Sequence, residues 1–199
     1  MKILELAQRT PEWYAARKGI PTASDFDKII TSTGKQSTQR KKYMLQLAGE
    51  RLGGIVEESY QSFAMVQGVE KEAEARSLYE LLHSPVQQVG FCLSDCGRFG
   101  CSPDGLVGED GLVEIKCPTI AVHVGYMIEK DVPTEYYCQV QGQILVTGRS
   151  FCDFWSYYPG LPPVYVRKTP DDTFQKALRK ELELFCTELD EVVKQLQNQ

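Results

Sequence analysis

The sequence lacks any long hydrophobic run and has only two histidines. No apolar stretch approaches the roughly 18 residues that cross a bilayer, which excludes a membrane-spanning helix. The first residues, MKILELAQRTPEW, lack the apolar core of a secretory signal peptide, so we expect a cytoplasmic protein. The histidines, His83 and His123, have no partner at metal-ligand spacing, which disfavours a histidine metal site.

No CxxC pair occurs among the seven cysteines. A cluster held by Cys92, Cys96, Cys101 and Cys117 is therefore disfavoured, because cluster and zinc sites usually contain such closely spaced pairs. Most of the cysteines lie in apolar or sheet-like segments. We therefore expect buried, reduced thiols that act as small hydrophobic side chains.

The chain has 199 residues, 42% of them hydrophobic, and shows no internal repeat or interior linker. This predicts a single domain over residues 1–199 with a sizeable core. The net charge of −5 is unevenly spread, because residues 1–53 contain ten Lys and Arg but five Asp and Glu. A basic N-terminal part beside an acidic remainder suits a phosphate-binding region next to a carboxylate site, but it also suits an ordinary mixed surface.

Hydrophobic periodicity and turn residues predict an α/β fold with a central sheet flanked by helices. The expected helices cover residues 10–18, 25–30, 39–52, 61–83, 119–130, 134–147 and 170–197. The expected strands cover residues 86–95, 98–107, 111–117, 150–158 and 163–168. The first three strands should be consecutive and antiparallel.

Residues 101–118, CSPDGLVGEDGLVEIKCP, contain the most informative pattern. The GEDG turn between two short apolar segments predicts a β-hairpin. Glu114 and Lys116 are two residues apart in the second strand and should point to the same face. Asp104, at the start of the first strand, should lie beside Glu114. Two carboxylates suit Mg²⁺ or Mn²⁺, and the lysine could orient or help deprotonate a water molecule.

A solvated surface ion pair is the alternative interpretation of this hairpin. Spacing alone also does not choose which acidic residue of the helix over 61–83 would complete a metal site. Gln139 and Gln143 lie four residues apart on one face of the helix over 134–147.

Residues 17–24, RKGIPTAS, join the end of one expected helix to the start of the next. Arg17 lies near the first helix end, and Ser24 near the next helix start. A guanidinium, a hydroxyl and free backbone N–H groups would form a phosphate pocket. The alternative is that Ser24 is merely a helix cap and Arg17 a surface residue.

Together these segments resemble the YqaJ-type viral recombinase family, the phage lambda exonuclease family, within the PD-(D/E)XK nuclease superfamily. The resemblance covers about residues 10–148 and consists of motifs in the family's order. They are RKGIPTAS (17–24), GVEKEAEAR (68–76), CSPDG (101–105), LVEIKCP (112–118) and YYCQVQ (136–141). The resemblance implies a restriction-endonuclease-like core with a mixed sheet.

The resemblance also implies roles for individual residues. The metal ligands would be Asp104, Glu114, the Ile115 carbonyl and, directly or through water, Glu72. Lys116 would be the catalytic lysine and Gln139 an active-site glutamine. Residues at the DNA end would be Arg17, Ser24 and Ser102 for the 5′-phosphate, with Met65 as an apolar residue that separates the duplex end.

The implied activity is Mg²⁺-dependent 5′-to-3′ exonuclease action on linear double-stranded DNA, which leaves a 3′ single strand for recombination by annealing. The resemblance further implies a ring-shaped homotrimer, a single-strand annealing partner and a phage or prophage origin in a bacterial host. Two alternatives remain from the sequence. One is a related nuclease of other polarity or endonucleolytic action, and the other is a non-catalytic DNA-end-binding module.

Overall fold

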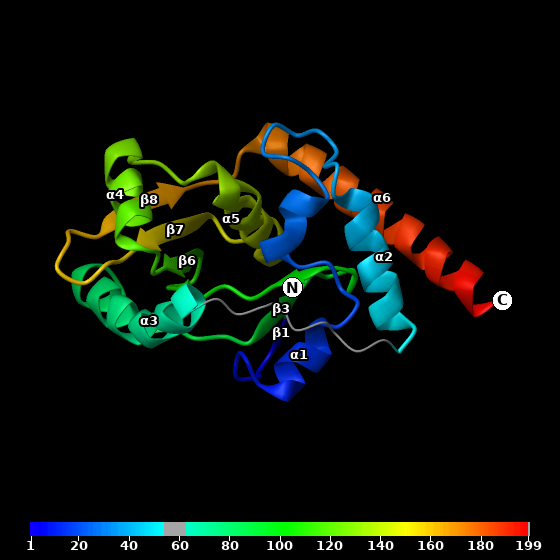
Figure 1. Ribbon diagram of the computed structural model, residues 1–199, viewed down its shortest axis with the longest axis horizontal. Coiled ribbons are helices and arrows are strands. Elements are labelled where there is room, and N and C mark those ends of the chain that lie inside the picture. Colours follow the sequence, from blue (N-terminus) through cyan, green and yellow to red (C-terminus); the bar gives the residue numbers. More distant parts are fainter. Residues whose placement is uncertain (54–62, 199) are drawn as a thin grey trace.

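A five-stranded mixed sheet forms the centre of the computed structural model, which describes residues 1–53 and 63–198, apart from the side chains of residues 63–70 (Figure 1). Its strand order is β2-β5-β6-β7-β8. The strands are β2 (Val86–Gln87), β5 (Gly105–Val107), β6 (Gly111–Lys116), β7 (Phe151–Ser156) and β8 (Val164–Lys168). Strands β6 and β7 are parallel and the other pairs are antiparallel, which confirms the expected mixed sheet.

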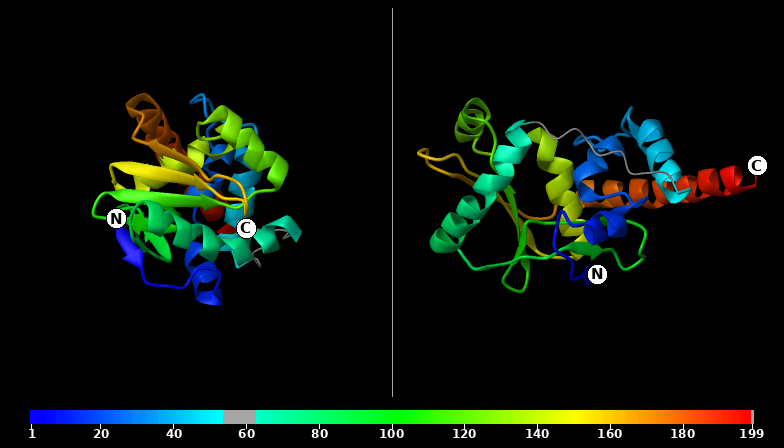
Figure 2. Two further views of the ribbon diagram at one scale, coloured as in Figure 1. Left: turned by 90° about the vertical axis from the view of Figure 1, so that its left-hand side faces the viewer. Right: turned by 60° about the horizontal axis from the view of Figure 1, so that its bottom comes forward.

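Helices cover both faces of the central strands. The parallel β6–β7 pair requires a crossover, which consists of α4 (Ile120–Glu129) and α5 (Thr134–Thr147). Helix α3 (Phe63–Leu82) packs on the opposite face (Figure 2). Because β6 is covered on both sides, its residues are buried as far as Ile115. No helix in the described residues combines the length and apolar character needed to cross a bilayer.

The two faces of the sheet contribute to two separate hydrophobic clusters. Leu112 and Phe154 point toward α5 and belong to the larger cluster. Val113 and Trp155 point toward α3 and belong to the smaller one, with Tyr79 from that helix. Since side chains alternate along a strand, Glu114 and Lys116 share the α5 face with Leu112.

A second, smaller sheet has the order β1-β3-β4, with β1 (Lys2–Leu4), β3 (Phe91–Leu93) and β4 (Gly100–Cys101). The prediction of two continuous strands over 86–95 and 98–107 is therefore wrong, because each segment leaves one sheet and enters the other. At Gly90 the chain passes so close to β1 that a Cβ atom would lie 2.9 Å from the Leu4 carbonyl oxygen. Pro103 interrupts the second segment, because proline has no N–H for strand pairing.

The N-terminal helices pack around this core. Helix α1 (Pro11–Arg17) and α2 (Arg40–Arg51) occur as expected. Residues Ala23–Lys28 form a 3₁₀ helix, η1, so the helix expected over 25–30 is present but begins and ends two residues earlier. The Thr22 hydroxyl does not cap this segment and instead accepts a hydrogen bond from Arg17 (3.3 Å).

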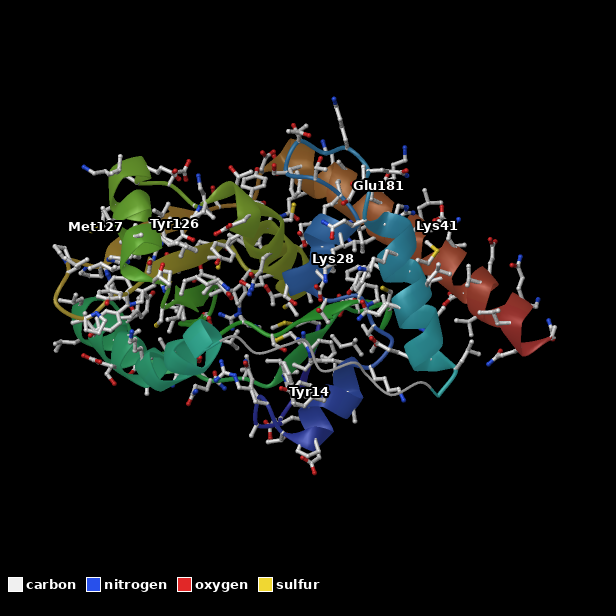
Figure 3. All side chains as sticks on the ribbon, in the orientation of Figure 1. Tyr14, Lys28, Lys41, Tyr126, Met127 and Glu181 are labelled. Atoms are coloured by element: carbon white, nitrogen blue, oxygen red, sulfur yellow. The ribbon has the colours of Figure 1, made fainter. Side chains whose placement is uncertain are left out.

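The long helix α6 (Asp172–Gln197) packs against α2, and its C-terminal end projects from the body of the molecule (Figure 1). Its buried stripe runs from Phe174 to Leu189, as the periodicity predicts. Glu181, labelled in Figure 3, accepts a hydrogen bond from Gln36 (3.0 Å) and so ties α6 to the loop before α2.

Candidate active site

The predicted hairpin is present and brings Asp104 to β6. Gly105 pairs with Val113 in the antiparallel register, so Asp104 falls opposite Glu114 at the end of the pairing. The Asp104 Oδ2 atom accepts a hydrogen bond from the Ile115 N–H (2.6 Å). The Asp104 side chain therefore satisfies the Ile115 N–H, which lies beyond the last residue of β6 that pairs with β5.

Glu114 and Lys116 lie on one face of β6, as predicted. The Lys116 Nζ atom is 2.7 Å from Glu114 Oε1. Glu114 is only 3% exposed, and the Lys116 ammonium lies over the Tyr136 ring at 4.5 Å from its centroid. This is a shielded ion pair at the end of a buried strand, and the interpretation as a solvated surface pair is wrong.

Helix α5 places two amides on the Glu114 carboxylate. Gln139 Nε2 donates to Oε1 (2.7 Å), and Gln143 Nε2 donates to Oε2 (2.5 Å). Lys116 also donates to Gln139 Oε1 (3.4 Å). The four-residue spacing of the glutamines places both on the sheet-facing side of α5, but the sequence interpretation assigned a role only to Gln139.

The close carboxylates and the lysine alter one another's protonation. Burial and the nearby Glu114 charge raise the pKa of Asp104 well above its ordinary value, although Lys116 lowers it in part. Burial alone would lower the pKa of Lys116, but the Glu114 and Asp104 charges outweigh it and raise that pKa. The raised pKa favours the protonated form of Lys116, which donates hydrogen bonds to Glu114 and Gln139.

A divalent cation fits the donors at this place. Asp104 and Glu114 are hard oxygen donors whose negative charges oppose each other, and a cation between them would relieve this repulsion. In a strand the N–H and C=O of one residue point to the same edge, so the Ile115 carbonyl lies on the Asp104 side, beyond the last paired residue of β5. Among the side chains that the structure describes, no three His, Cys, Asp or Glu residues form a ready-made metal cluster.

Glu72 lies near this site but is held by two arginines. Its carboxylate pairs with Arg9 (2.6 Å) and Arg76 (3.0 Å). Glu72 and Asp104 line one cavity of about 500 Å³, and the charge of Glu72 adds to the rise in the pKa of Asp104. Glu72 therefore lies near Asp104, in the same cavity. Glu114 instead lies on the face of the sheet that α5 covers. Neither Arg9 nor Arg76 is indicated by the sequence patterns, because their contacts with Glu72 form only in the folded chain.

The predicted phosphate-pocket residues form a second cluster beside the hairpin. Arg17 donates to the hydroxyls of Ser102 (3.0 Å) and Thr22 (3.3 Å), and Thr22 bonds to Ser24 (3.1 Å). The Arg17 guanidinium lies over the Trp13 ring, 4.1 Å from its centroid. Burial lowers the pKa of Arg17, and no carboxylate in the described part of the chain forms an ion pair with it. Its hydrogen-bond partners are neutral, although the nearby Asp25 carboxylate partly opposes the lowering of its pKa. A shielded guanidinium whose direct hydrogen bonds go to hydroxyls is suited to an anion.

Two of the pocket residues were missed from the sequence. Trp13 precedes Arg17 by four residues in α1, so the helical spacing could have indicated their contact. Thr22 lies in the RKGIPTAS segment, where the sequence pattern indicates only Arg17 and Ser24. The expected apolar residue Met65 has its side chain outside the described residues.

Comparisons with known proteins identify a family and related structures. The YqaJ-like viral recombinase domain family matches residues 12–150. An alkaline exonuclease from Laribacter hongkongensis, LHK-Exo, is 35% identical, and the match covers 95% of this chain and 97% of that one, with a TM-score of 0.86. Its structure in complex with dAMP gives 36% identity, the same coverages and a TM-score of 0.87.

A more distant structure shares the fold. The phage-related exonuclease from Haemophilus somnus 129PT is 15% identical, with 89% of this chain and 96% of that chain covered and a TM-score of 0.69. The comparison with curated protein sequences found no match. Because the family match spans most of the chain and agrees with the similarity to LHK-Exo, this chain belongs to the YqaJ-like viral recombinase domain family.

Proposed function

We propose that this protein is a Mg²⁺-dependent exonuclease that degrades one strand of linear double-stranded DNA in the 5′-to-3′ direction. It starts at 5′-phosphorylated ends and leaves a 3′ single strand for recombination by annealing. The similarity to LHK-Exo, an alkaline exonuclease, supports the reaction class. Nucleases of this kind typically use a divalent metal ion, and Mn²⁺ is the expected substitute.

The observation that carries the proposal is the short segment from Ser102 to Asp104. Ser102 accepts a hydrogen bond from Arg17 in the anion pocket, and Asp104 faces Glu114 at the carboxylate site. Two residues of chain span at most about 7 Å. A terminal phosphate bound by Arg17 would therefore place the next part of the strand beside the carboxylates, as removal of short units from an end requires.

The bound metal would activate the attacking water and stabilise the leaving 3′-oxygen. Asp104, Glu114 and the Ile115 carbonyl would hold it, with Glu72 acting directly or through water. Protonated Lys116 would orient the water and stabilise negative charge on the scissile phosphate. Gln139, which contacts both Lys116 and Glu114, would keep these groups in register.

We further propose that three copies form a ring around the DNA and that a single-strand annealing protein is the partner. The family resemblance supports both assignments. A ring needs positive charge only on its inner surface, which reconciles DNA binding with the net charge of −5. We expect the protein to act in the cytoplasm of a bacterial host, encoded by a phage or prophage.

The test supplies purified protein with linear duplexes that carry 5′-phosphate or 5′-hydroxyl ends and with closed circular DNA, each with Mg²⁺ or with EDTA. Faster degradation of the 5′-phosphorylated duplex, only with Mg²⁺, would support the proposal. Cutting of circles would indicate an endonuclease, and mononucleotides released first from 3′ ends would indicate the other polarity. Binding without cleavage would indicate a non-catalytic end-binding module.

A further inference from the structure

The two amides on Glu114 come from the same helix but have different surroundings. Gln143 is 1% exposed, whereas Gln139 is partly exposed. Of the two Glu114 carboxylate oxygens, Gln143 contacts only Oε2, and this contact is buried. Gln139 and Lys116 both contact Oε1. One carboxylate oxygen therefore has a buried, fixed partner, and the other has two partners that border the open part of the site.

The Gln143 amide has only one orientation that satisfies its contacts. The Cys152 thiol on β7 donates to Gln143 Oε1 (3.5 Å), which directs the Nε2 group at Glu114. Cys152 is fully buried, and burial raises the pKa of its thiol, so it remains a neutral donor. The chain of contacts from Cys152 through Gln143 to Glu114 thus links the interior of the sheet to the carboxylate.

We propose that Gln143 is a positioning residue that fixes Glu114 for cation binding, and that Gln139 is the exchangeable partner on the other oxygen. This inference rests on the proposed metal-dependent function. A carboxylate oxygen has about two acceptor positions, and Lys116 and Gln139 already occupy those of Oε1. These two groups can turn toward solvent or substrate. Gln143 has no such freedom, and it keeps the plane of the carboxylate constant.

The assignment predicts different effects for the two glutamines. Loss of the Gln143 amide leaves a buried carboxylate oxygen without a partner and free to rotate. Residues that orient a metal ligand typically change metal affinity by about 10- to 100-fold when they are replaced. Gln143→Leu should therefore weaken Mn²⁺ binding by about this factor, with activity restored in large part at saturating metal. Gln139→Leu should instead lower the maximal rate more than the metal affinity.

Isothermal titration calorimetry with Mn²⁺ and no DNA measures the affinity directly. Gln141→Leu is the matched control, since Gln141 is equally buried on the same helix but bonds to the Thr169 carbonyl, Asp171 and Gln175. Gln143→Met, which retains most of the side-chain volume, serves as a second variant if the leucine variant does not fold. Thermal unfolding of each variant separates loss of stability from loss of affinity.

A weakened Mn²⁺ affinity in the Gln143 variants, with an unchanged affinity in Gln141→Leu, would support the inference. Equal affinities in folded Gln143→Met and the unchanged protein would overturn it, as would an equal loss in Gln141→Leu. Absence of Mn²⁺ binding by the unchanged protein would also overturn it. The calorimetry needs no DNA, so it remains decisive even if the DNA assays refute the exonuclease activity.

Discussion

Replacement of Arg17 by alanine should slow degradation from 5′-phosphorylated ends far more than from 5′-hydroxyl ends. The guanidinium is held over Trp13 and against the Ser102 and Thr22 hydroxyls, with no ion-pair partner among the described residues. It is thus positioned before any phosphate arrives, and little side-chain freedom remains to be lost on binding.

The size of the effect follows from the contact that is lost. A hydrogen bond to a charged group contributes roughly 1.5–3 kcal/mol. At about 1.36 kcal/mol per factor of ten, Arg17→Ala should lower kcat/KM on 5′-phosphorylated ends by roughly 10- to 150-fold. The kcat/KM of Arg17→Lys should lie between those of the unchanged protein and Arg17→Ala, because lysine keeps the charge but not the planar pair of donors.

The assay compares initial rates of nucleotide release from two duplexes that differ only in the 5′ group. Lys18→Ala is the matched control, since it removes the neighbouring cation, which is exposed to solvent. Thermal unfolding checks that the loss of the Trp13 and Ser102 contacts has not unfolded α1. Equal slowing on both duplexes by Arg17→Ala would refute the assignment of this pocket to the terminal phosphate.

Three other predictions concern stability and the metal. Tyr79→Phe removes a hydrogen bond (2.6 Å) to fully buried Asp153. It should lower the free energy of unfolding, measured by urea denaturation, by roughly 1.5–3 kcal/mol, and an unchanged free energy would contradict the contribution of this buried hydrogen bond. Asp171→Ala removes the α6 N-cap and should cost about 1 kcal/mol at neutral pH. Bonds from the Phe174 N–H and the Tyr137 hydroxyl lower the pKa of Asp171 in the folded state, so its contribution is present above the unfolded-state pKa and lost as pH falls through the folded-state pKa. The unfolding free energies of the two proteins should therefore converge in acid, and a constant difference would refute this cause. EDTA should abolish cleavage but not DNA binding, with recovery on added Mg²⁺; cleavage that persists in EDTA would argue against the metal site.

Local sequence patterns were sufficient for most of the fold. The three- and four-residue spacing from Phe174 to Leu189 predicts α6, and the GEDG turn predicts the β5–β6 hairpin. The patterns failed where the path depends on distant parts of the chain. The close approach at Gly90 and the break at Pro103 move the chain between two sheets, and neither is a property of strand periodicity.

The same distinction applies to the site. Period-two alternation places Glu114 and Lys116 together, and the hairpin register brings Asp104 opposite Glu114. The pairing of Glu72 with Arg9 joins residues that are 63 positions apart, so local spacing could not reveal it. Likewise, the contact between Gln143 and Glu114 depends on how α5 packs on the sheet. The family resemblance supplied roles for residues such as Gln139, but not the partners that hold them.

The most direct test of the nuclease centre is the replacement of Lys116 by alanine. The lysine lies between Glu114 and Gln139 and, on this account, stabilises charge on the reacting phosphate. Cleavage of a 5′-phosphorylated linear duplex with Mg²⁺ and binding of the same duplex in EDTA are measured for both proteins. We predict nearly unchanged DNA binding and a cleavage rate at least about a hundredfold lower. Cleavage close to that of the unchanged protein would contradict the proposed catalytic centre.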